Sequence, residues 1–156
     1  MKIPILTILS TLSLLACKVS QKPSSVSGTY ELVSKTIKKD DDVYGYAGQI
    51  QVKELPHNKV VVSFFITKGA PSYNSGSFVD TLDYIDGTAF YTAKEFDPSC
   101  KITFKFSAKG VQVDEQTDDY NSGCGFGHAV VTNGFFKRVT SEVPVIKDLV
   151  TGEELN

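Results

Sequence analysis

The sequence has few of the residues from which enzyme and metal sites are built. It contains only two histidines, His57 and His128, and three cysteines. A Ser/His/Asp or Cys/His site needs a nucleophile, a base and an orienting group within mutual reach. Neither histidine lies in a recognisable nucleophile motif, and no glycine-rich phosphate loop follows a strand and opens a helix. We therefore expect no catalytic activity, no cofactor and no bound metal.

Long apolar runs are also scarce. One such run spans residues 3–16, directly after Met1 and Lys2. It is shorter than the roughly 20 residues that a membrane-spanning helix requires. A short basic start, an apolar stretch and a small residue before Cys17 are typical of an export signal. Because no second stretch of this kind follows, we expect no membrane-spanning segment in the rest of the chain.

Residues Leu14-Leu15-Ala16-Cys17 resemble the lipobox of bacterial lipoproteins, although position 15 usually holds a smaller residue. The resemblance implies that residues 1–16 are a removable signal peptide and that Cys17 becomes the lipid-carrying N-terminus. Several acyl chains on one residue give stable membrane anchoring, whereas one chain does not. The alternative is an ordinary secretory signal that is cleaved near Ala16.

The residues after the cysteine are rich in Ser, Lys, Gln and Pro. Such a composition does not order itself, so residues 17–27 are interpreted as the lipidated cysteine and a flexible tether. Lys18, and not Asp, follows Cys17. By resemblance to enteric lipoproteins, this places the protein in the bacterial cell envelope at the outer membrane.

Composition predicts one domain beyond the tether. About 130 residues remain, and the hydrophobic fraction of 41% is enough for one core. Removing the signal removes one charged residue, Lys2, so the net charge changes from −2 to −3. A nearly neutral chain has no large basic surface for nucleic acid. We expect a domain at residues 28–140, a C-terminal tail at residues 141–156, and membrane contact only through the lipid.

Two cysteines, Cys100 and Cys124, remain once Cys17 is lipidated. In an oxidising compartment such a pair usually bridges. The predicted disulfide would close a loop of roughly 25 residues, which contributes about 3 kcal/mol in the chain-entropy model. The alternative is a metal site with His128, but two thiols and one histidine fall short of the four ligands of structural zinc.

The domain is composed of strands and turns. Residues Lys101–Ser107 alternate between apolar and polar side chains, as a half-buried strand does. Asp86-Gly87 and Asn133-Gly134 predict tight hairpin turns, the second within residues 129–136. Other strands are expected at residues 28–35, 48–53, 60–66, 78–83, 88–95 and 111–113.

Helical periodicity is not sustained anywhere over three turns, and the one candidate is a short helix after Ser141. The sequence therefore predicts an all-β fold. We expect a small antiparallel meander barrel of about eight or nine strands, because closure removes exposed sheet edges. A two-sheet β-sandwich is the alternative.

The start of the domain, Gly28-Thr29-Tyr30, together with Arg138 in the last strand, resembles the lipocalin-like arrangement. There a Gly-x-Trp strand start is covered by a basic residue from the final strand, and here Tyr30 takes the place of the tryptophan. The resemblance implies a carrier of a small apolar ligand as an alternative function. Residues such as Phe64 and Phe104 would then line a pocket, although the domain is short for a large cavity.

The tetrapeptide Tyr-Asn-Ser-Gly occurs twice, at Tyr73–Gly76 and Tyr120–Gly123. Rigid aromatic and adaptable polar residues are typical of contact loops, although turns favour Asn, Ser and Gly in any case. Strands of a meander alternate in direction, so both segments should lie at one end of the barrel. We predict one binding surface, whose residues are Tyr73, Asn74, Tyr120, Asn121, Phe126 and His128. The alternative is that these tyrosines only cap the core.

A lipid-tethered, disulfide-linked small barrel resembles the membrane-bound lysozyme inhibitors of Gram-negative bacteria in architecture and export. No residues of that family's inhibitory segment are matched. The resemblance implies a lipid-anchored envelope binding protein with a protective role, whose partner is a protein such as a lysozyme.

Overall fold

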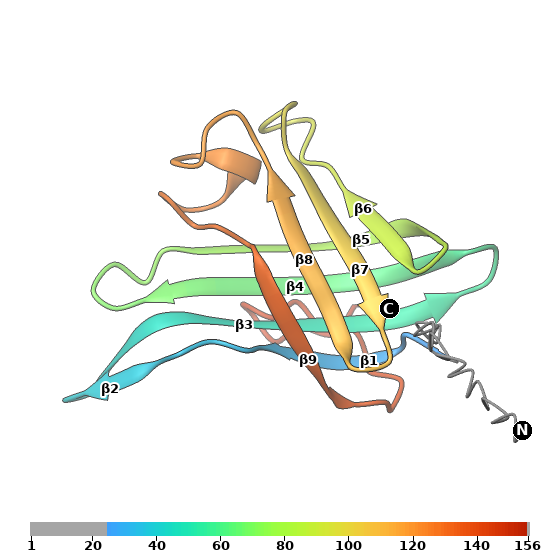
Figure 1. The fold of residues 1–156 in the computed structure, drawn as a ribbon, viewed down its shortest axis with the longest axis horizontal. Coiled ribbons are helices and arrows are strands. Elements are labelled where there is room, and N and C mark those ends of the chain that lie inside the picture. Colours follow the sequence, from blue (N-terminus) through green and yellow to red (C-terminus); the bar gives the residue numbers. More distant parts are fainter. Residues whose placement is uncertain (1–24, 156) are drawn as a thin grey trace, which may run out of the picture.

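The computed structural model describes residues 25–155. The predicted signal peptide (residues 1–16), with the residues that resemble a lipobox, and Cys17 lie outside these residues. The described chain contains nine strands and one short 3-10 helix (Figure 1). The strands are β1 (Gly28–Leu32), β2 (Ile37–Lys39), β3 (Asp42–Leu55), β4 (Lys59–Gly69), β5 (Ser75–Ile85), β6 (Thr88–Tyr91), β7 (Lys101–Ser107), β8 (Gly110–Gln116) and β9 (Gly134–Thr140), and the helix is η1 (Gly123–Gly125).

The strands form a closed antiparallel meander. From β3 to β9 each strand pairs with the next along the chain, and β1 closes the ring by pairing with both β9 and β3. Eight strands therefore make the barrel, and β2 is an additional strand that pairs only with β3. This confirms the predicted all-β barrel, and the sandwich alternative is not the fold. Among the described residues no helix is long and apolar enough to cross a membrane.

Alternating side chains fill the barrel with apolar groups. In β7, Ile102, Phe104 and Phe106 are buried, as the sequence pattern predicts. Phe64 of β4 lies at the centre of the core, with its ring centroid 6.1 Å from that of Phe104 and 5.9 Å from that of Phe136. These three rings are completely buried, so aromatic packing occupies the middle of the barrel.

The two ends of the barrel differ. At the turn end lie the short connections 56–58, 86–87 and 108–109, together with the start of β1 and the end of β9. At the loop end lie the longer connections 70–74, 92–100 and 117–133. The predicted hairpin turn at Asp86-Gly87 is confirmed, since Ile85 pairs with Thr88 across it. The two residues of that turn have φ values of 49° and 80°, as a type I′ turn requires.

Tyr30 and Arg138 close the turn end. The Tyr30 ring is 1% exposed, and its hydroxyl donates to the Val26 carbonyl at 2.6 Å. The Arg138 guanidinium lies over this ring and donates through Nη2 to the Ser27 carbonyl. This is the contact that the lipocalin-like resemblance implies. Val26 and Ser27 are themselves buried, so the last residues assigned to the tether belong to the folded domain.

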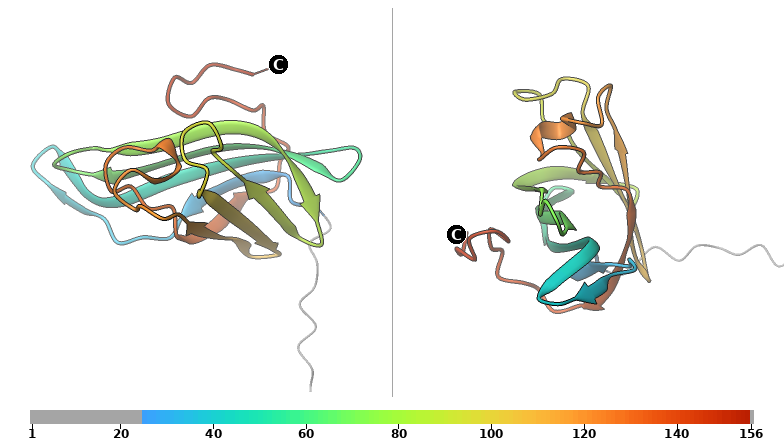
Figure 2. Two further views of the ribbon diagram at one scale, coloured as in Figure 1. Left: turned by 90° about the horizontal axis from the view of Figure 1, so that it is seen from above. Right: turned by 90° about the vertical axis from the view of Figure 1, so that its left-hand side faces the viewer.

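The C-terminal tail is not helical, contrary to the helix suggested after Ser141. It lies along the outside of the barrel (Figure 2). The Lys147 carbonyl accepts a hydrogen bond from Ser63 Oγ at 2.5 Å, and the Lys147 amide donates to Gln51 Oε1 at 3.0 Å. Ile146 is 5% exposed beside them. The tail therefore covers outward-facing residues of β3 and β4, which explains why β4 is apolar on both faces.

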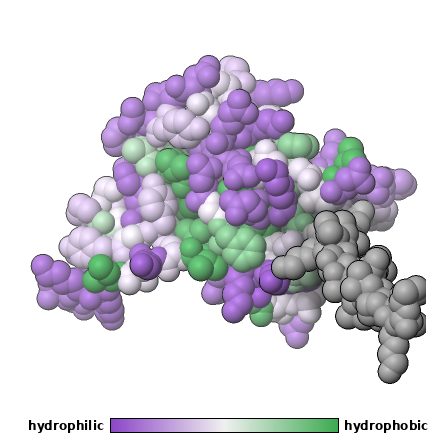
Figure 3. Space-filling model, in the orientation of Figure 1, coloured by the Kyte–Doolittle hydropathy of each residue, from purple (hydrophilic) through white to green (hydrophobic). Residues whose placement is uncertain are grey.

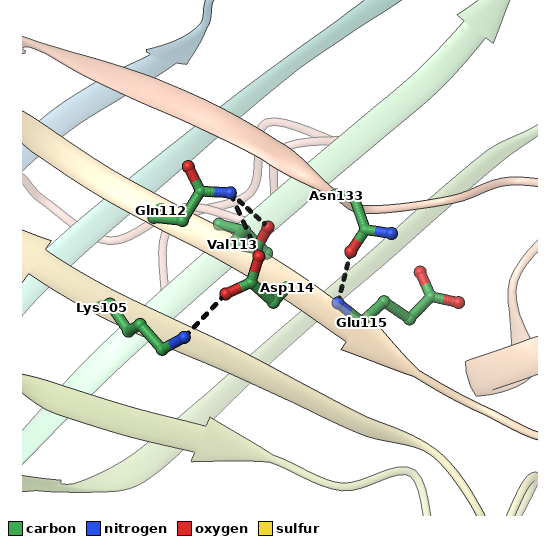
Figure 4. A network of polar contacts seen from close by, with 6 residues as sticks. All are labelled: Lys105, Gln112, Val113, Asp114, Glu115 and Asn133. Atoms are coloured by element: carbon green, nitrogen blue, oxygen red, sulfur yellow. Dashed lines mark hydrogen bonds and ion pairs between the residues drawn. The ribbon is translucent and has the colours of Figure 1, made fainter.

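Asn133-Gly134 is not a hairpin turn, so this prediction is wrong. Residues 130–133 form no strand, and Gly134 is the first residue of β9. The Asn133 side chain accepts the Glu115 amide at 2.5 Å, as Figure 4 shows. The Glu115 carboxylate in turn accepts the Thr132 amide at 2.8 Å. Hydrogen bonds of the Asn133 and Glu115 side chains thus hold this segment beside β8, where backbone pairing between strands would otherwise do so. A local sequence pattern does not reveal such contacts.

Candidate binding surface at the loop end

The structure brings the two Tyr-Asn-Ser-Gly segments to the same end of the barrel. Asn74 Nδ2 donates to the His128 carbonyl at 3.0 Å, and the Gly127 amide donates to the Ser75 carbonyl at 2.9 Å. Lys68 Nζ also lies 3.4 Å from the His128 carbonyl. The connection after the second segment therefore packs directly on the first segment, as the alternation of strand direction predicts.

Tyr73 is held in place while remaining exposed. Its backbone is left-handed, with a φ of 51°, and its side chain is 49% exposed. The hydroxyl donates to Asp42 Oδ1 at 2.6 Å and accepts the Val43 amide at 3.4 Å. The hydrogen bond to Asp42 raises the pKa of Tyr73. Tyr73 thus links the 70–74 connection to the start of β3 while about half of its surface stays exposed.

Tyr120 and Asn121 also lie on the surface. Tyr120 is 46% exposed, and its hydroxyl donates to the Glu115 carbonyl at 3.5 Å. The Asn121 amide donates to Asp119 Oδ1 at 2.9 Å, and the Asn121 carbonyl accepts the Ala129 amide at 2.9 Å. The Asn121 side chain is exposed, as is His128. These residues are available for contact with a partner.

Phe126 has a different role from the one predicted. Its ring stacks on Phe64 with centroids 6.3 Å apart and an interplanar angle of 19°. A Cβ at Gly76 would lie 2.3 Å from this ring, so glycine is required at that position. Phe126 is partly buried and packs against the core. It is not an exposed anchor.

The predicted disulfide is present. Cys100 and Cys124 are bonded, with their Cα atoms 5.0 Å apart. The bond joins the 92–100 connection to the 117–133 connection. Asp97 lies close to the two sulfur atoms, and the three residues have the spacing of a metal site. Because both sulfurs are in the disulfide, no thiolate is left there to bind a metal.

Asp97 organises the same two connections, and the sequence analysis did not identify it as a site residue. Its carboxylate accepts hydrogen bonds from the hydroxyls of Ser99 at 2.6 Å and Thr117 at 2.7 Å. It also accepts the amides of Ser99 at 2.9 Å and Cys124 at 3.0 Å. These donors, first of all the Ser99 hydroxyl, hold the pKa of Asp97 well below its usual range. Only the Asp-Pro-Ser turn was visible in the sequence.

The loop end is acidic and carries exposed aromatic rings. Phe96 is 77% exposed and borders a pocket of about 360 Å³ between the two connections. The surface over these connections is mostly hydrophilic in Figure 3. In the 92–100 and 117–133 connections the only lysine or arginine is Lys94, and the acidic residues are Glu95, Asp97, Asp118 and Asp119. The surface therefore combines negative charge with rings at Tyr73, Phe96 and Tyr120.

Comparisons of the sequence and the structure with known proteins identify no relative of this chain. No protein-family model matches the chain, and no curated protein and no solved structure matches it.

Proposed function

We propose that this protein is a non-catalytic binding protein of the bacterial cell envelope, which binds a protein partner through the loop end. One observation carries the proposal. The centre of the barrel is filled by the buried rings of Phe64, Phe104 and Phe136, and the Phe126 ring stacks on Phe64. The surface left for a ligand is then outside the barrel, where exposed aromatic residues are the usual anchors of protein interfaces.

The fold supports an orientation of this surface relative to a membrane. Ser25, the first described residue, donates through Oγ to Glu54 Oε2 at 2.6 Å near the turn end. If Cys17 carries the lipid, the stretch from Cys17 to Ser25 reaches at most about 30 Å when extended. The tether then joins the domain near the turn end, and the loop end is the end farther from the attachment point. A surface far from the attachment point suits contact with a soluble protein.

The charge of the loop end suggests the class of partner. Four carboxylates and one lysine in two adjacent connections attract a protein with a basic surface and raise its rate of association. The disulfide and the Asp97 network hold these connections in place, which lowers the entropy lost on binding. A lysozyme is the partner that the resemblance to lysozyme inhibitors suggests.

Binding of lysozyme to the chain from Lys18 onward tests this proposal. The Tyr73→Ala, Tyr120→Ala double variant should bind at least about tenfold more weakly, since exposed aromatic anchors contribute most of the binding energy. The matched control is Phe135→Ala, which removes a ring that is 36% exposed on β9. No binding by the unmodified chain, or equal affinities for both variants, would contradict the proposal.

A lipocalin-like carrier is the second candidate, and the contact between Tyr30 and Arg138 favours it. This contact closes one end of the barrel in the manner that the resemblance implies. The packed interior argues against it. An apolar fluorescent dye distinguishes the two functions, because a carrier binds the dye at one saturable site, whereas a filled barrel binds it only after Phe64→Ala opens a cavity.

A further inference from the structure

One edge of strand β5 has no strand partner over most of its length. On one side β5 pairs with β4 from Ser75 to Asp83. On the other side it pairs with β6 only at Tyr84 and Ile85. Beyond this short contact the two strands diverge (Figure 1). Among the described residues, the other edge of residues 76–83 is therefore a seam in the barrel wall.

The register identifies the backbone groups that face this seam. Successive residues of a strand direct their N–H and C=O groups to opposite edges. The Ser75 carbonyl accepts the Gly127 amide on the seam side, and the Tyr84 amide donates to Asn58 on the β4 side. Ser77, Val79, Thr81 and Asp83 therefore point their backbone groups into the seam, where an added strand would find donors and acceptors.

Asp80 is placed unusually beside this edge. Asp80 lies on the same face of β5 as Phe78 and Leu82, and it pairs with the fully buried Val62 of β4. Nevertheless its side chain is exposed. Its Oδ1 accepts the Thr81 amide at 2.7 Å, which is one of the seam-facing donors. No described lysine, arginine or histidine forms an ion pair with Asp80. The seam thus exposes an unpaired carboxylate.

Aromatic rings form the rest of the seam. Phe78 of β5 and Tyr91 of β6 stack with centroids 3.7 Å apart and an interplanar angle of 6°, so side chains hold the two strands together where the ladder has ended. Burial and the nearby Asp80 charge raise the pKa of Tyr91. A groove of about 370 Å³ runs along these residues to the exposed ring of Phe96.

We propose that the seam binds an extended segment of a partner protein that carries an arginine or lysine side chain. The segment pairs with the backbone groups of Ser77 and Val79 and with the Thr81 carbonyl, since the Thr81 amide already donates to Asp80. Its cationic side chain reaches Asp80 beside the Phe78–Tyr91 stack. A free strand edge supplies main-chain affinity, and a carboxylate next to an aromatic ring attracts a cation. This inference rests on the proposed function, because it names the chemistry of a protein partner, but it uses a surface separate from Tyr73 and Tyr120.

The competing account is that Asp80 only protects the edge, since inward-pointing charges on edge strands prevent self-association. Fluorescence anisotropy with the labelled peptide Thr-Val-Arg-Val-Thr distinguishes the two accounts. The chain from Lys18 onward should bind this peptide at least about tenfold more tightly than the same peptide with Glu in place of Arg. Methylation of the peptide nitrogens should abolish binding, because main-chain pairing requires them.

Variants of the chain locate the site. Asp80→Asn should weaken peptide binding about tenfold, because it removes the charge. Its matched control is Asp83→Asn, whose carboxylate is paired with Lys59 at 2.7 Å and whose loss should leave binding unchanged. Val79→Pro removes a seam-facing N–H while leaving the bonds to β4 in place, and it should abolish binding.

Hydrogen exchange gives a readout that does not depend on the variants folding. In the free protein the amides of Ser77 and Val79 should exchange faster than those of Phe78 and Asp80, which pair with β4, and the arginine peptide should slow them. No peptide binding, equal binding of the Glu peptide, or unchanged exchange at Ser77 and Val79 overturns the inference. The Tyr73→Ala, Tyr120→Ala variant should bind the peptide as tightly as the wild type. This result distinguishes a failure of the seam proposal from a failure of the proposed loop-end binding surface.

Discussion

The guanidinium of Arg138 lies across the ring of Tyr30, with its Cζ 5.8 Å from the ring centroid. The two residues come from the last and the first strands of the barrel, which pair at these positions. The same arginine donates to the Ser27 carbonyl. One side chain therefore fixes the N-terminal entry of the chain to the strand that closes the ring.

Replacing Arg138 by alanine should destabilise the fold by about 1–3 kcal/mol, because a charge-assisted hydrogen bond and a cation–π contact are both lost. Urea unfolding measures the change. Lys137→Ala is the matched control, since Lys137 is the exposed neighbour on β9. Equal stability of the two variants would show that the contact with Tyr30 contributes nothing.

Stability should fall at alkaline pH through Tyr30. Burial raises the pKa of Tyr30 to about 12, against an opposing effect of Arg138. The unfolded chain ionises near pH 10, so the stabilising contribution of the neutral phenol is complete below that pH and is lost as the pH rises toward about 12. Denaturant midpoints over this range should decline more steeply for the wild type than for Tyr30→Phe. If the denaturant midpoints of the two proteins decline in parallel, ionisation of Tyr30 is not the cause of the alkaline loss of stability.

Asp97 should make the loop end sensitive to acid. Hydrogen bonds from Ser99, Cys124 and Thr117 lower its pKa in the folded state. Its contribution is present above the unfolded pKa of about 3.9 and is lost as the pH falls below that value. Asp97→Asn should lower the folding stability at neutral pH, and the stability of this variant should fall less steeply than that of the wild type as the pH is lowered. Asp118→Asn is the control, because only its backbone amide bonds to this network; the same acid profile in both variants would contradict the prediction.

Removal of the disulfide should cost about 2–5 kcal/mol of folding free energy. Cys100→Ser, Cys124→Ser tests this by denaturant unfolding without reductant, and reduction of the wild type should reproduce the effect. Thiol titration of unfolded, unreduced protein should find neither cysteine free. Two reactive thiols in freshly purified exported protein would mean that the bond does not form in the cell.

Cys17→Ser should abolish fatty-acid labelling and either release the protein into a soluble fraction or block processing of the signal. The resemblance of Leu14-Leu15-Ala16-Cys17 to a lipobox motivates this expectation. Metabolic labelling with a radioactive fatty acid gives the answer. Ala16→Gly is a suitable control, because it keeps a small residue before the cysteine. Equal labelling of Cys17→Ser and the wild type would exclude lipidation at this position.

Local patterns in the sequence were sufficient to predict the architecture. Alternation in Lys101–Ser107 and the Asp86-Gly87 turn each describe contacts between neighbouring residues, and a meander is built from such contacts. The Cys100–Cys124 bond followed from the number of cysteines and from the expectation that the chain is exported. The alternating direction of the strands alone determines at which end of the barrel each connection lies. For this reason Tyr73 and Tyr120 were correctly placed at one end.

Features that depend on distant partners were not predicted. Asn133 is held by the Glu115 amide of β8, so the turn signal in its sequence was misleading. Phe126 turns inward because Gly76, far away in the sequence, leaves room for its ring. Asp97 accepts hydrogen bonds from Ser99 in one connection and from Thr117 and Cys124 in another. The β5 seam arises where the pairing of β5 with β6 stops. None of these relationships has a local signature.

The pairing of β1 with β9 has a consequence for how the chain reaches its final state. Synthesis proceeds from the N-terminus, so β1 emerges first and its second partner, β9, emerges last. Until Gly134–Thr140 arrives, β1 and β8 each present an edge without its β9 partner. Closure depends on contacts between opposite ends of the sequence, which form slowly. A chain that ends before Gly134 should therefore leave two strand edges unpaired, and such edges promote pairing with other chains.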